Sequence, residues 1–466
     1  MSALTVINPA TGNVLRELPA DDAASVTRKA AMARRAQPGW AQRPLAERIG
    51  ILRRFRDLLV ERRDHLSCTM TAETGKPITM SRKEIGATPG RVDFFLENVG
   101  ALMGIDTRDL QPAGALVPGA GEMEELVTQA PLGVVANISA RNYPYFVGSN
   151  VFVPALLTGS AVLYKPSEFA SLTGMAIAGL LHEAGVPDDV FIPLIGAGDV
   201  GAALLEQRVD GVFFTGSYRT GVGVAQTTAA KLIPTQLQLG GKDPAYVADD
   251  VDAATAGAAL ADGAFYNNGQ SRCAVERIYV HESIFDAFVE AFIAAVEGFQ
   301  MGDPNSESTY LGPLTREAQL GALEAQVQDA LTKGATLRTG GRRADRAGWY
   351  FEPTVLTEVD HRMKVMRDET FGPLIGVQRV SNDQEAIDLM ADTQYGLTAA
   401  VFSRDRKRAA HVLAAVPTGT AYWNCCDRVS PRLPWSGVGH SGLGAALGVE
   451  GIRAFLRPRA WHLRSL

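Results

Sequence analysis

The chain has 466 residues, 46% of them hydrophobic and 21% charged, so we expect a soluble globular protein with two or three domains. The 45 basic and 51 acidic side chains give a net charge of −6, which offers no general attraction for nucleic acid, and no apolar stretch is long enough to span a membrane. The N-terminus lacks a signal-peptide pattern and the 4 cysteines form no disulfide framework, so we expect a cytoplasmic protein.

The N-terminal part predicts helices. Asp21 and Asp22 are suitable caps for a helix running toward Gln37. After Pro44, apolar residues at helical spacing predict a second helix; they are Ile49, Leu52, Phe55, Leu58 and Leu59. The segment Glu73–Pro77 (ETGKP) predicts a helix stop and a turn.

From residue 131 onward, short apolar runs alternate with helix-like segments. The predicted strands are Val134–Ile138, Ala161–Tyr164, Phe191–Ile195 and Val212–Phe214, and the predicted helices are Ser171–Glu183, Asp199–Gln207, Asp252–Phe265 and Ile284–Phe299. This alternation predicts βαβ units with parallel sheets in two α/β domains. Two further strand-like segments, Glu122–Gln129 and Arg453–Leu466, are expected to lie outside both cores, where such strands often pair with another subunit.

Three turns follow predicted strands, and two of them contain glycine. Gly196–Gly201 fits G-x-G-x-x-G, but no acidic residue ends a strand about 20 residues later, so a tight turn is the favoured interpretation. In the segment Lys165–Glu168 (KPSE), the lysine and glutamate are suitable for ribose contacts, although from these four residues alone a polar turn capped by Ser167 is the favoured interpretation. In Phe214–Ser217 (FTGS), the serine is suitable for a pyrophosphate contact near a helix N-terminus.

Cys273 ends the polar segment NNGQSRC, which is unusual for a core cysteine. A reactive thiol, a redox sensor and an inert thiol are all compatible with this pattern. The 7 histidines show no metal-ligand spacing and no cysteine–histidine pair is evident, so we expect no metal.

Taken together, these segments resemble the NAD(P)-dependent aldehyde dehydrogenase superfamily over almost the whole chain. The segments that carry the resemblance are INPATG at Ile7–Gly12, ETGKP at Glu73–Pro77, NYP at Asn142–Pro144, KPSE at Lys165–Glu168, FTGS at Phe214–Ser217, LGGKDP at Leu239–Pro244, GQSRC at Gly269–Cys273, ETFGP at Glu369–Pro373, NCCD at Asn424–Asp427 and SGLG at Ser441–Gly444. Each segment is short, but their order and spacing together are highly specific.

The resemblance implies a subunit of three parts that assembles into a homodimer or homotetramer. The nucleotide-binding domain is expected at residues 1–113 and 132–240, and the catalytic domain at 241–440. A small β-stranded oligomerisation arm is expected at 114–131 and 441–466. The expected substrate is a small-molecule aldehyde, with no nucleic-acid or membrane partner.

The resemblance also assigns roles to single residues. Cys273 matches the nucleophile that forms a thioester, and Asn142 matches the side-chain donor to the oxyanion. The positions that resemble cofactor contacts are Lys165, Ser167, Glu168, Gly216, Ser217, Glu369 and Phe371. A carboxylate at Glu168 would repel a 2′-phosphate, so we expect NAD, with NADP as the alternative.

The chain departs from the family pattern at the general base. Gln238 occupies the usual glutamate position, and Ala446 occupies the position of a second glutamate that sometimes assists. An amide has no useful basicity, although it can orient a water molecule. Three hypotheses follow: slow hydrolysis with water placed by Gln238, acyl transfer to coenzyme A, or a substitute base such as Asp427 or Glu450. A protein that keeps the fold but only binds is a further alternative.

Two arginines mark other departures. Arg141 replaces the usual tryptophan before Asn142 and brings charge near the expected cofactor site. Arg428 follows NCCD at the expected substrate mouth, where it could pair with the carboxylate of a semialdehyde, although a solvated loop arginine or a salt bridge with Asp427 is the favoured interpretation. From the sequence we therefore expect an oxidoreductase that converts an aldehyde, with semialdehydes included, to an acid.

Overall fold

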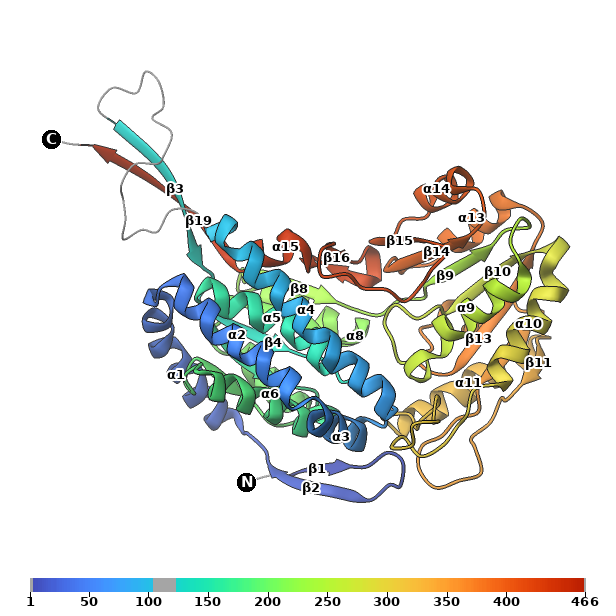
Figure 1. Cartoon of the computed structure of the whole chain (residues 1–466), viewed down its shortest axis with the longest axis horizontal. Coiled ribbons are helices and arrows are strands. Elements are labelled where there is room, and N and C mark those ends of the chain that lie inside the picture. Colours follow the sequence, from blue (N-terminus) through green and yellow to red (C-terminus); the bar gives the residue numbers. More distant parts are fainter. Residues whose placement is uncertain (1–2, 104–122, 465–466) are drawn as a thin grey trace.

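The computed structural model describes residues 3–103 and 123–464. In this part of the chain, two large sheets of mostly parallel strands are flanked by helices, and a two-stranded ribbon projects from one end (Figure 1). The predicted α/β class with two α/β units and a small β arm is confirmed. No helix within the described ranges is long and apolar enough to cross a membrane.

The first sheet has the strand order β17-β8-β7-β4-β5-β6. Its strands are β4 (Val134–Ile138), β5 (Ala161–Lys165), β6 (Phe191–Pro193), β7 (Gly211–Thr215), β8 (Thr235–Gln238) and β17 (Gly442–Leu443). All neighbours are parallel except β17, which pairs antiparallel with β8 and brings Gly442 opposite Gln238. Strand β6 ends before the predicted Ile195 because the Ile195 N–H is donated to the Asp21 side chain at 2.8 Å instead of to a strand.

The helices of this unit are α1 (Ala23–Gln42), α2 (Leu45–Glu61), α3 (Arg63–Thr74), α4 (Ile78–Met103), α5 (Pro144–Thr158), α6 (Ser171–Ala184), α7 (Gly198–Leu205) and α8 (Tyr218–Ala229). The predicted cap is confirmed, because Asp22 accepts from the Ser25 N–H at 2.7 Å. Helix α1 continues past the predicted end at Gln37, since Trp40 is buried and donates to the Leu156 carbonyl. Gly75 ends α3 with a φ of 77°, as the ETGKP turn predicts.

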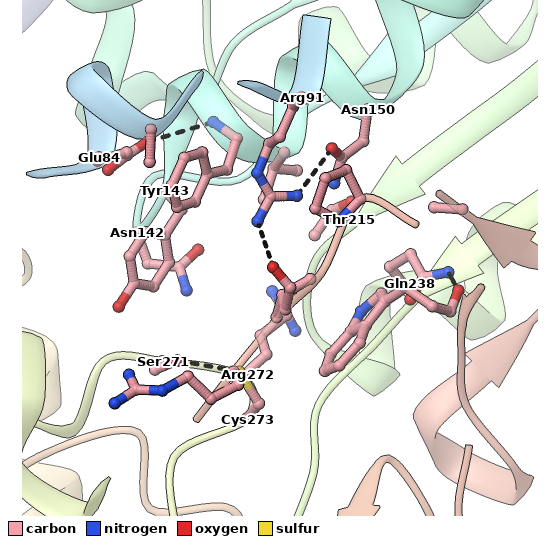
Figure 2. A pocket seen from close by; sticks show the side chains of 18 of the residues that line it. Glu84, Arg91, Asn142, Tyr143, Asn150, Thr215, Gln238, Ser271, Arg272 and Cys273 are labelled. Carbon is pink, nitrogen blue, oxygen red and sulfur yellow. Dashed lines mark hydrogen bonds between the residues drawn. The ribbon is translucent and has the colours of Figure 1, made fainter. Parts of the chain in front are cut away.

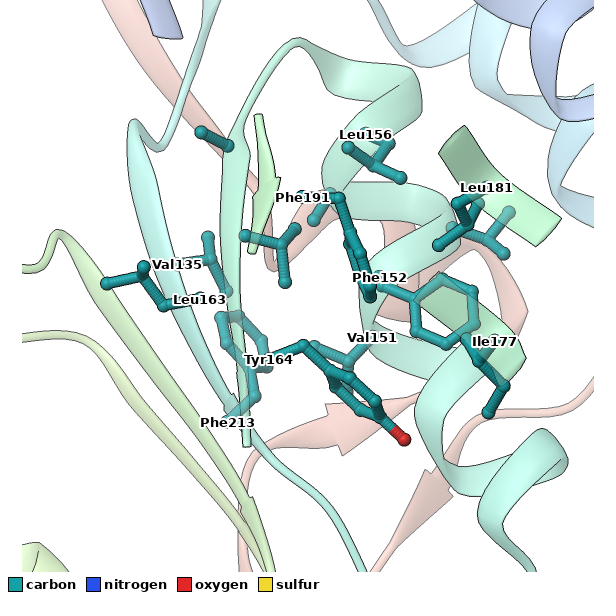
Figure 3. Close-up of a cluster of buried hydrophobic side chains, with 14 of the residues drawn as sticks. Val135, Val151, Phe152, Leu156, Leu163, Tyr164, Ile177, Leu181, Phe191 and Phe213 are labelled. Atoms are coloured by element: carbon teal, nitrogen blue, oxygen red, sulfur yellow. The ribbon is translucent and has the colours of Figure 1, made fainter. Parts of the chain in front are cut away.

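An aromatic cluster fastens α5 and α6 to the first sheet (Figure 3). The ring of Phe152 on α5 lies 5.9 Å from Tyr164 on β5 and 5.5 Å from Phe191 on β6, both in edge-to-face geometry. All three rings are buried, so each contributes both apolar burial and a specific ring contact. This packing fixes α5, whose N-terminus carries Asn142 and Tyr143.

The second sheet has the order β11-β12-β13-β10-β9-β14-β15, parallel except for β11. Its strands are β9 (Pro244–Val247), β10 (Arg277–His281), β11 (Thr336–Thr339), β12 (Thr354–Thr357), β13 (Leu374–Val380), β14 (Thr398–Phe402) and β15 (Thr420–Trp423). Its helices are α9 (Ala253–Phe265), α10 (Phe285–Glu297), α11 (Ala318–Thr332), α12 (Lys364–Arg367), α13 (Asp383–Ala391) and α14 (Arg406–Ala415). The helices predicted near α9 and α10 are confirmed.

Smaller elements complete the described chain. They are the ribbons β1 (Ala3–Ile7) with β2 (Val14–Pro19), β16 (Trp435–Ser436) with β18 (Ala445–Ala446), and β3 (Met123–Pro131) with β19 (Leu456–Arg464), the helix α15 (Gly448–Arg453), and the 3₁₀ turns Glu168–Ala170, Tyr266–Gly269, Glu282–Ile284 and Gly439–Ser441. Both predicted outlying strands are present and pair with each other; Glu122 and residues 465–466 lie outside the described ranges. Of the C-terminal segment expected for the arm, residues 441–466, only β19 lies in this ribbon. The preceding residues belong to the first unit instead: strand β17 pairs with β8 of the first sheet, and α15 packs on α4 and α5.

Candidate active site

A cavity of about 620 Å³ lies where the two large units meet. Residues from α4, α5, the carboxyl ends of β7 and β8, the loop before β10 and the loop after β15 line it (Figure 2). Of the expected site residues, Cys273, Asn142, Gln238 and Arg428 lie in its lining. The fold therefore brings together residues that are far apart in the sequence.

The NNG segment determines how Cys273 reaches this cavity. Asn267, Asn268 and Gly269 all have left-handed φ angles of 53°, 56° and 68°. The Asn268 amide donates to the carbonyls of Gly312 and Pro313 at 2.9 and 2.8 Å, which anchors the loop. A Cβ at Gly269 would lie 2.3 Å from a backbone oxygen, so glycine is required there. This tight turn places the thiol in the cavity wall.

The Cys273 thiol is buried and donates to a carboxylate. Its Sγ lies 2.8 Å from Asp427 Oδ1, which also accepts from Ser271 Oγ at 2.9 Å. Burial raises the pKa of Cys273 well above its usual range, and the Asp427 charge raises it further. Burial also raises the pKa of Asp427. The thiol is therefore protonated at rest, with a proton acceptor directly beside it.

Asn142 lies across from this loop at the N-terminus of α5. Its Nδ2 donates to the Gln270 carbonyl at 3.0 Å, while its Oδ1 is buried and has no partner among the described residues. Asn142 is thus held next to the cysteine loop by a bond to that loop itself. To stabilise an oxyanion on a substrate, the amide has to share or release this carbonyl.

Gln238 ends β8 at the opposite wall. Its Nε2 donates to the Trp435 carbonyl at 3.2 Å, and its buried Oε1 has no partner in the described chain. The side chain is thus fixed at its nitrogen, and its oxygen is left as an acceptor without a partner among the described residues. It can orient water but cannot take a proton from it.

The other residues considered for catalysis or substrate binding are Glu450, Ala446 and Arg428. Glu450 is exposed on α15 and pairs with Arg453 at 3.1 Å, outside the cavity lining. Ala446 does line the cavity, but it has no ionisable group. Arg428 is exposed in the lining, and no ion pair with Asp427 is present among the described residues. Of the two candidate substitute bases, only Asp427 is near Cys273.

The residues that resemble adenosine-ribose and pyrophosphate contacts follow β5 and β7. Lys165 Nζ lies 3.6 Å from Glu168 Oε2, and burial lowers the pKa of this lysine. Ser167 Oγ accepts from the Phe169 N–H, so the polar-turn interpretation also holds. Ser217 caps α8, and the Gly216 carbonyl accepts from Arg272 at 2.8 Å.

Glu369 and Phe371 both lie near Arg272, the residue before Cys273. Burial raises the pKa of Glu369 to about 7, while Arg272 opposes the shift. Its Oε2 lies 2.5 Å from where a Cβ on Gly240 would be, so the LGGK segment leaves room for this carboxylate. Phe371 adopts a φ of 46°, a strained conformation for a bulky residue that is typical of functional sites.

Three arginines converge on Phe169 and Phe371. The Arg141 guanidinium lies 5.9 Å from the Phe169 ring centroid and 5.2 Å from that of Phe371, while Arg316 lies over Phe169 and Arg272 over Phe371. The Nε of each arginine is buried without a hydrogen-bond partner in the described ranges. Burial and the charges of Arg316 and Arg272 lower the pKa of Arg141 to about 9. Such a cluster of three arginines fits the anionic phosphates of a dinucleotide.

Sequence reasoning missed two residues of the cavity. Arg91 on α4 is buried in its lining, and Glu84 on the same helix accepts from the N–H groups of Tyr145 and Phe146 at 2.9 and 3.3 Å. Neither lies in a recognisable motif. The only available signal was a set of charged residues on the otherwise apolar face of a helix, which does not reveal what that face contacts.

Comparison with known proteins agrees with the aldehyde dehydrogenase resemblance of the motifs. A model of the aldehyde dehydrogenase family matches residues 2–461. A succinate-semialdehyde dehydrogenase [NADP(+)] from Deinococcus radiodurans is 36% identical over 96% of this chain and 92% of its own length. The peroxisomal aminoaldehyde dehydrogenase 2 of Pisum sativum is 35% identical over 97% of this chain and 91% of its own.

A solved structure shows the same fold. The betaine aldehyde dehydrogenase of Staphylococcus aureus in complex with NAD⁺ superimposes with a TM-score of 0.93 at 31% identity, covering 99% of this chain and 91% of that one. These comparisons lend no support to the coenzyme A-dependent or the non-catalytic alternative.

Proposed function

This chain belongs to the aldehyde dehydrogenase family and oxidises an aldehyde to a carboxylic acid with NAD(P), and we propose that it does so through a thioester on Cys273. The net reaction consumes an aldehyde, NAD⁺ and water and yields a carboxylate, NADH and two protons. The observation that supports the role of Cys273 is its position in the wall of the cavity, with its thiol bonded to a carboxylate.

The first half of the reaction needs a thiolate and a stabilised oxyanion. Asp427 accepts the Cys273 proton while the sulfur attacks the aldehyde carbon, so the C=O bond becomes a C–O⁻ bond. The Asn142 amide then donates to that oxygen, a contribution of about 3 kcal/mol in comparable sites. The bound nicotinamide supplies the hydride acceptor. When hydride leaves the former aldehyde carbon, the C=O bond re-forms as a thioester.

The second half of the reaction needs a base for water. Gln238 lies in the cavity lining with its Oε1 unpaired in the described chain, so it can orient the water, but it cannot remove the proton. Asp427 first loses the Cys273 proton to solvent. It then accepts a proton from this water molecule while the water oxygen attacks the thioester carbon. The carbon–sulfur bond breaks, the acid leaves, and the Cys273 thiolate takes the proton back from Asp427. Asp427 therefore replaces the glutamate that is absent at position 238.

The cofactor is proposed to be NAD. The close approach of Lys165 and Glu168 at the end of β5 supports a ribose site there, and the Glu168 carboxylate would repel a 2′-phosphate. The arginines at Phe169 and Phe371 support binding of the pyrophosphate. NADP remains the alternative cofactor, since a relative named above uses it.

The remaining expectations concern the whole protein. We retain the three-part division of the subunit, with residues 441–455 placed with the first sheet, and a homodimer or homotetramer assembled through the β3–β19 ribbon. A cytoplasmic location is proposed from the composition, because 4 cysteines without a disulfide framework fit a reducing compartment.

The proposed function is tested by rapid mixing of enzyme, NAD and a small panel of aldehydes, with and without coenzyme A. We expect an initial burst of NADH equal to the active-site concentration, followed by slower turnover that coenzyme A does not change. The variant Cys273→Ala should show neither phase, with NAD binding as the control for folding. No burst with any aldehyde would refute the role of Cys273, and turnover that requires coenzyme A would restore the acylating alternative.

A further inference from the structure

Arg91 is a buried cation inside the substrate cavity. It enters from α4, and its side chain points into the cavity from the wall opposite the Cys273 loop in the view of Figure 2. Only 5% of the residue is exposed. Its guanidinium donates to Asn150 Oδ1 at 3.2 Å and to the Val429 carbonyl at 3.3 Å, both of which are neutral. Burial lowers its pKa to about 10, so it remains charged at neutral pH.

No carboxylate in the described chain is within ion-pair distance of Arg91. The carboxylate that raises its pKa, Glu84, is already engaged by Lys76 and by two backbone N–H groups at the start of α5. A charged arginine that is buried without an anion is costly for a protein to maintain. An anionic ligand would compensate that charge, because a guanidinium presents a fork of donors that matches a carboxylate.

The rest of the lining contains further cations. Lys83, Arg428 and Arg432 are exposed residues of the lining with no ion pair among the described residues. The two other carboxylates of the lining are occupied: Asp262 accepts from Tyr310 Oη at 2.6 Å, and Asp427 accepts from the Cys273 thiol. The cavity thus holds cations without an ion-pair partner in the described chain, whereas each of its carboxylates already accepts a hydrogen bond.

We propose that Arg91 binds a carboxylate at the far end of the aldehyde substrate, so that the preferred substrates are aldehydes with a terminal carboxylate. This inference rests on the proposed aldehyde oxidation. It also separates two classes that the relatives' names leave open: semialdehydes carry a negative tail, whereas aminoaldehydes and betaine aldehyde carry a positive one. A positive tail would meet the Arg91 charge in a low-dielectric site and be rejected.

The test compares matched substrates in two variants. The probes are 4-oxobutanoate, its methyl ester and 3-aminopropanal, and the variants are Arg91→Met, which keeps the length, and Arg91→Lys, which keeps the charge. We expect the wild-type kcat/KM ratio of 4-oxobutanoate to its ester to fall about 10- to 100-fold in Arg91→Met and to be partly retained in Arg91→Lys. Arg338→Met, an exposed change on β11, is the matched control and should leave the ratio unchanged.

A second measurement does not depend on turnover. Succinate, which has two carboxylates, should protect Cys273 of the wild type from alkylation by iodoacetamide, and the protection should be lost in Arg91→Met. An unchanged substrate ratio in Arg91→Met, or a wild-type preference for the ester or the amine, would overturn the proposal while leaving the NADH burst intact. Absence of a burst with all three probes would instead refute the proposed function.

Discussion

Asp427 is the carboxylate best placed to compensate for the amide at position 238. It lies on a strained turn with a φ of 47°, and its Oδ1 accepts from both Ser271 and Cys273. An aspartate in this strained left-handed conformation next to a nucleophile is the type of local strain that occurs at functional sites. Since burial raises its pKa, this residue is a stronger base once ionised than a surface aspartate would be.

The first prediction concerns this base. Asp427→Asn should lower steady-state turnover about 10²- to 10⁴-fold, because general-base catalysis has this magnitude. In the wild type, turnover should rise with pH, since the raised pKa leaves Asp427 protonated in a range where an ordinary aspartate is ionised; the variant should lose this rise. Stopped-flow and steady-state NADH assays across pH measure both effects.

The control for this prediction is Gln238→Glu in the Asp427→Asn background. A carboxylate restored at position 238 should recover part of the turnover, because it supplies a base at the end of β8. If Asp427→Asn turned over at the wild-type rate, another group would have to activate the water.

The second prediction concerns Arg141. Arg141→Leu should weaken NAD binding about tenfold and reduce its dependence on salt, because one charge of the proposed phosphate site is removed. Titration calorimetry without aldehyde measures binding separately from chemistry. Arg338→Leu serves as the surface control, and equal NAD affinity in Arg141→Leu and the wild type would contradict the phosphate role.

At the scale of elements, one glutamate connects two helices. Glu73 near the end of α3 accepts from the Leu172 and Thr173 N–H groups at 2.9 and 2.6 Å, which caps α6 from outside because α6 has no side-chain cap of its own. Burial raises the pKa of Glu73 from 4.5 to about 7. The helix start that follows the KPSE segment is thus held by a residue of the ETGKP turn.

The third prediction follows from this raised pKa. Because the folded pKa of Glu73 exceeds its unfolded value, the contribution of this residue to stability is fully present at pH values below 4.5. That contribution is lost as the pH rises toward 7, by about 3 kcal/mol in total. Glu73→Gln stays neutral and keeps an acceptor, so its free energy of unfolding should exceed that of the wild type increasingly between pH 5 and pH 8. Urea denaturation measures this difference. Glu47→Gln, on the surface of α2, should show no such divergence.

At the scale of the whole molecule, the β3–β19 ribbon projects away from both sheets (Figure 1). It is paired over its full length, from Met123 with Arg464 to Pro131 with Leu456. An isolated pair of strands is marginally stable in water, so this ribbon requires a further partner. Val127, in its middle, is 61% exposed.

The fourth prediction tests that partner. Val127→Asp should shift the protein from an oligomer to a smaller species, because it places a charge on an apolar surface expected to be buried between subunits. Light scattering coupled to size exclusion measures the mass. Leu337→Asp, an exposed apolar residue on β11, is the matched control. A wild-type monomer, or an oligomer unaffected by Val127→Asp, would contradict assembly through the ribbon.

The sequence by itself determined the two α/β units, most strand positions and the residues that resemble the nucleophile and cofactor contacts. These depend on local patterns: apolar runs of strand length, caps such as Asp22, and short motifs that include Cys273. It also showed that glutamate is absent at position 238.

Only the tertiary structure shows that Asp427 contacts Cys273 whereas Glu450 pairs with Arg453 outside the cavity lining, because both are ordinary carboxylates in the sequence. The same holds for Arg91 and for the arginines around Phe169 and Phe371, which come from segments far apart in the chain. Local patterning encodes secondary structure, whereas the charge of a cavity is a sum over side chains that only folding brings together.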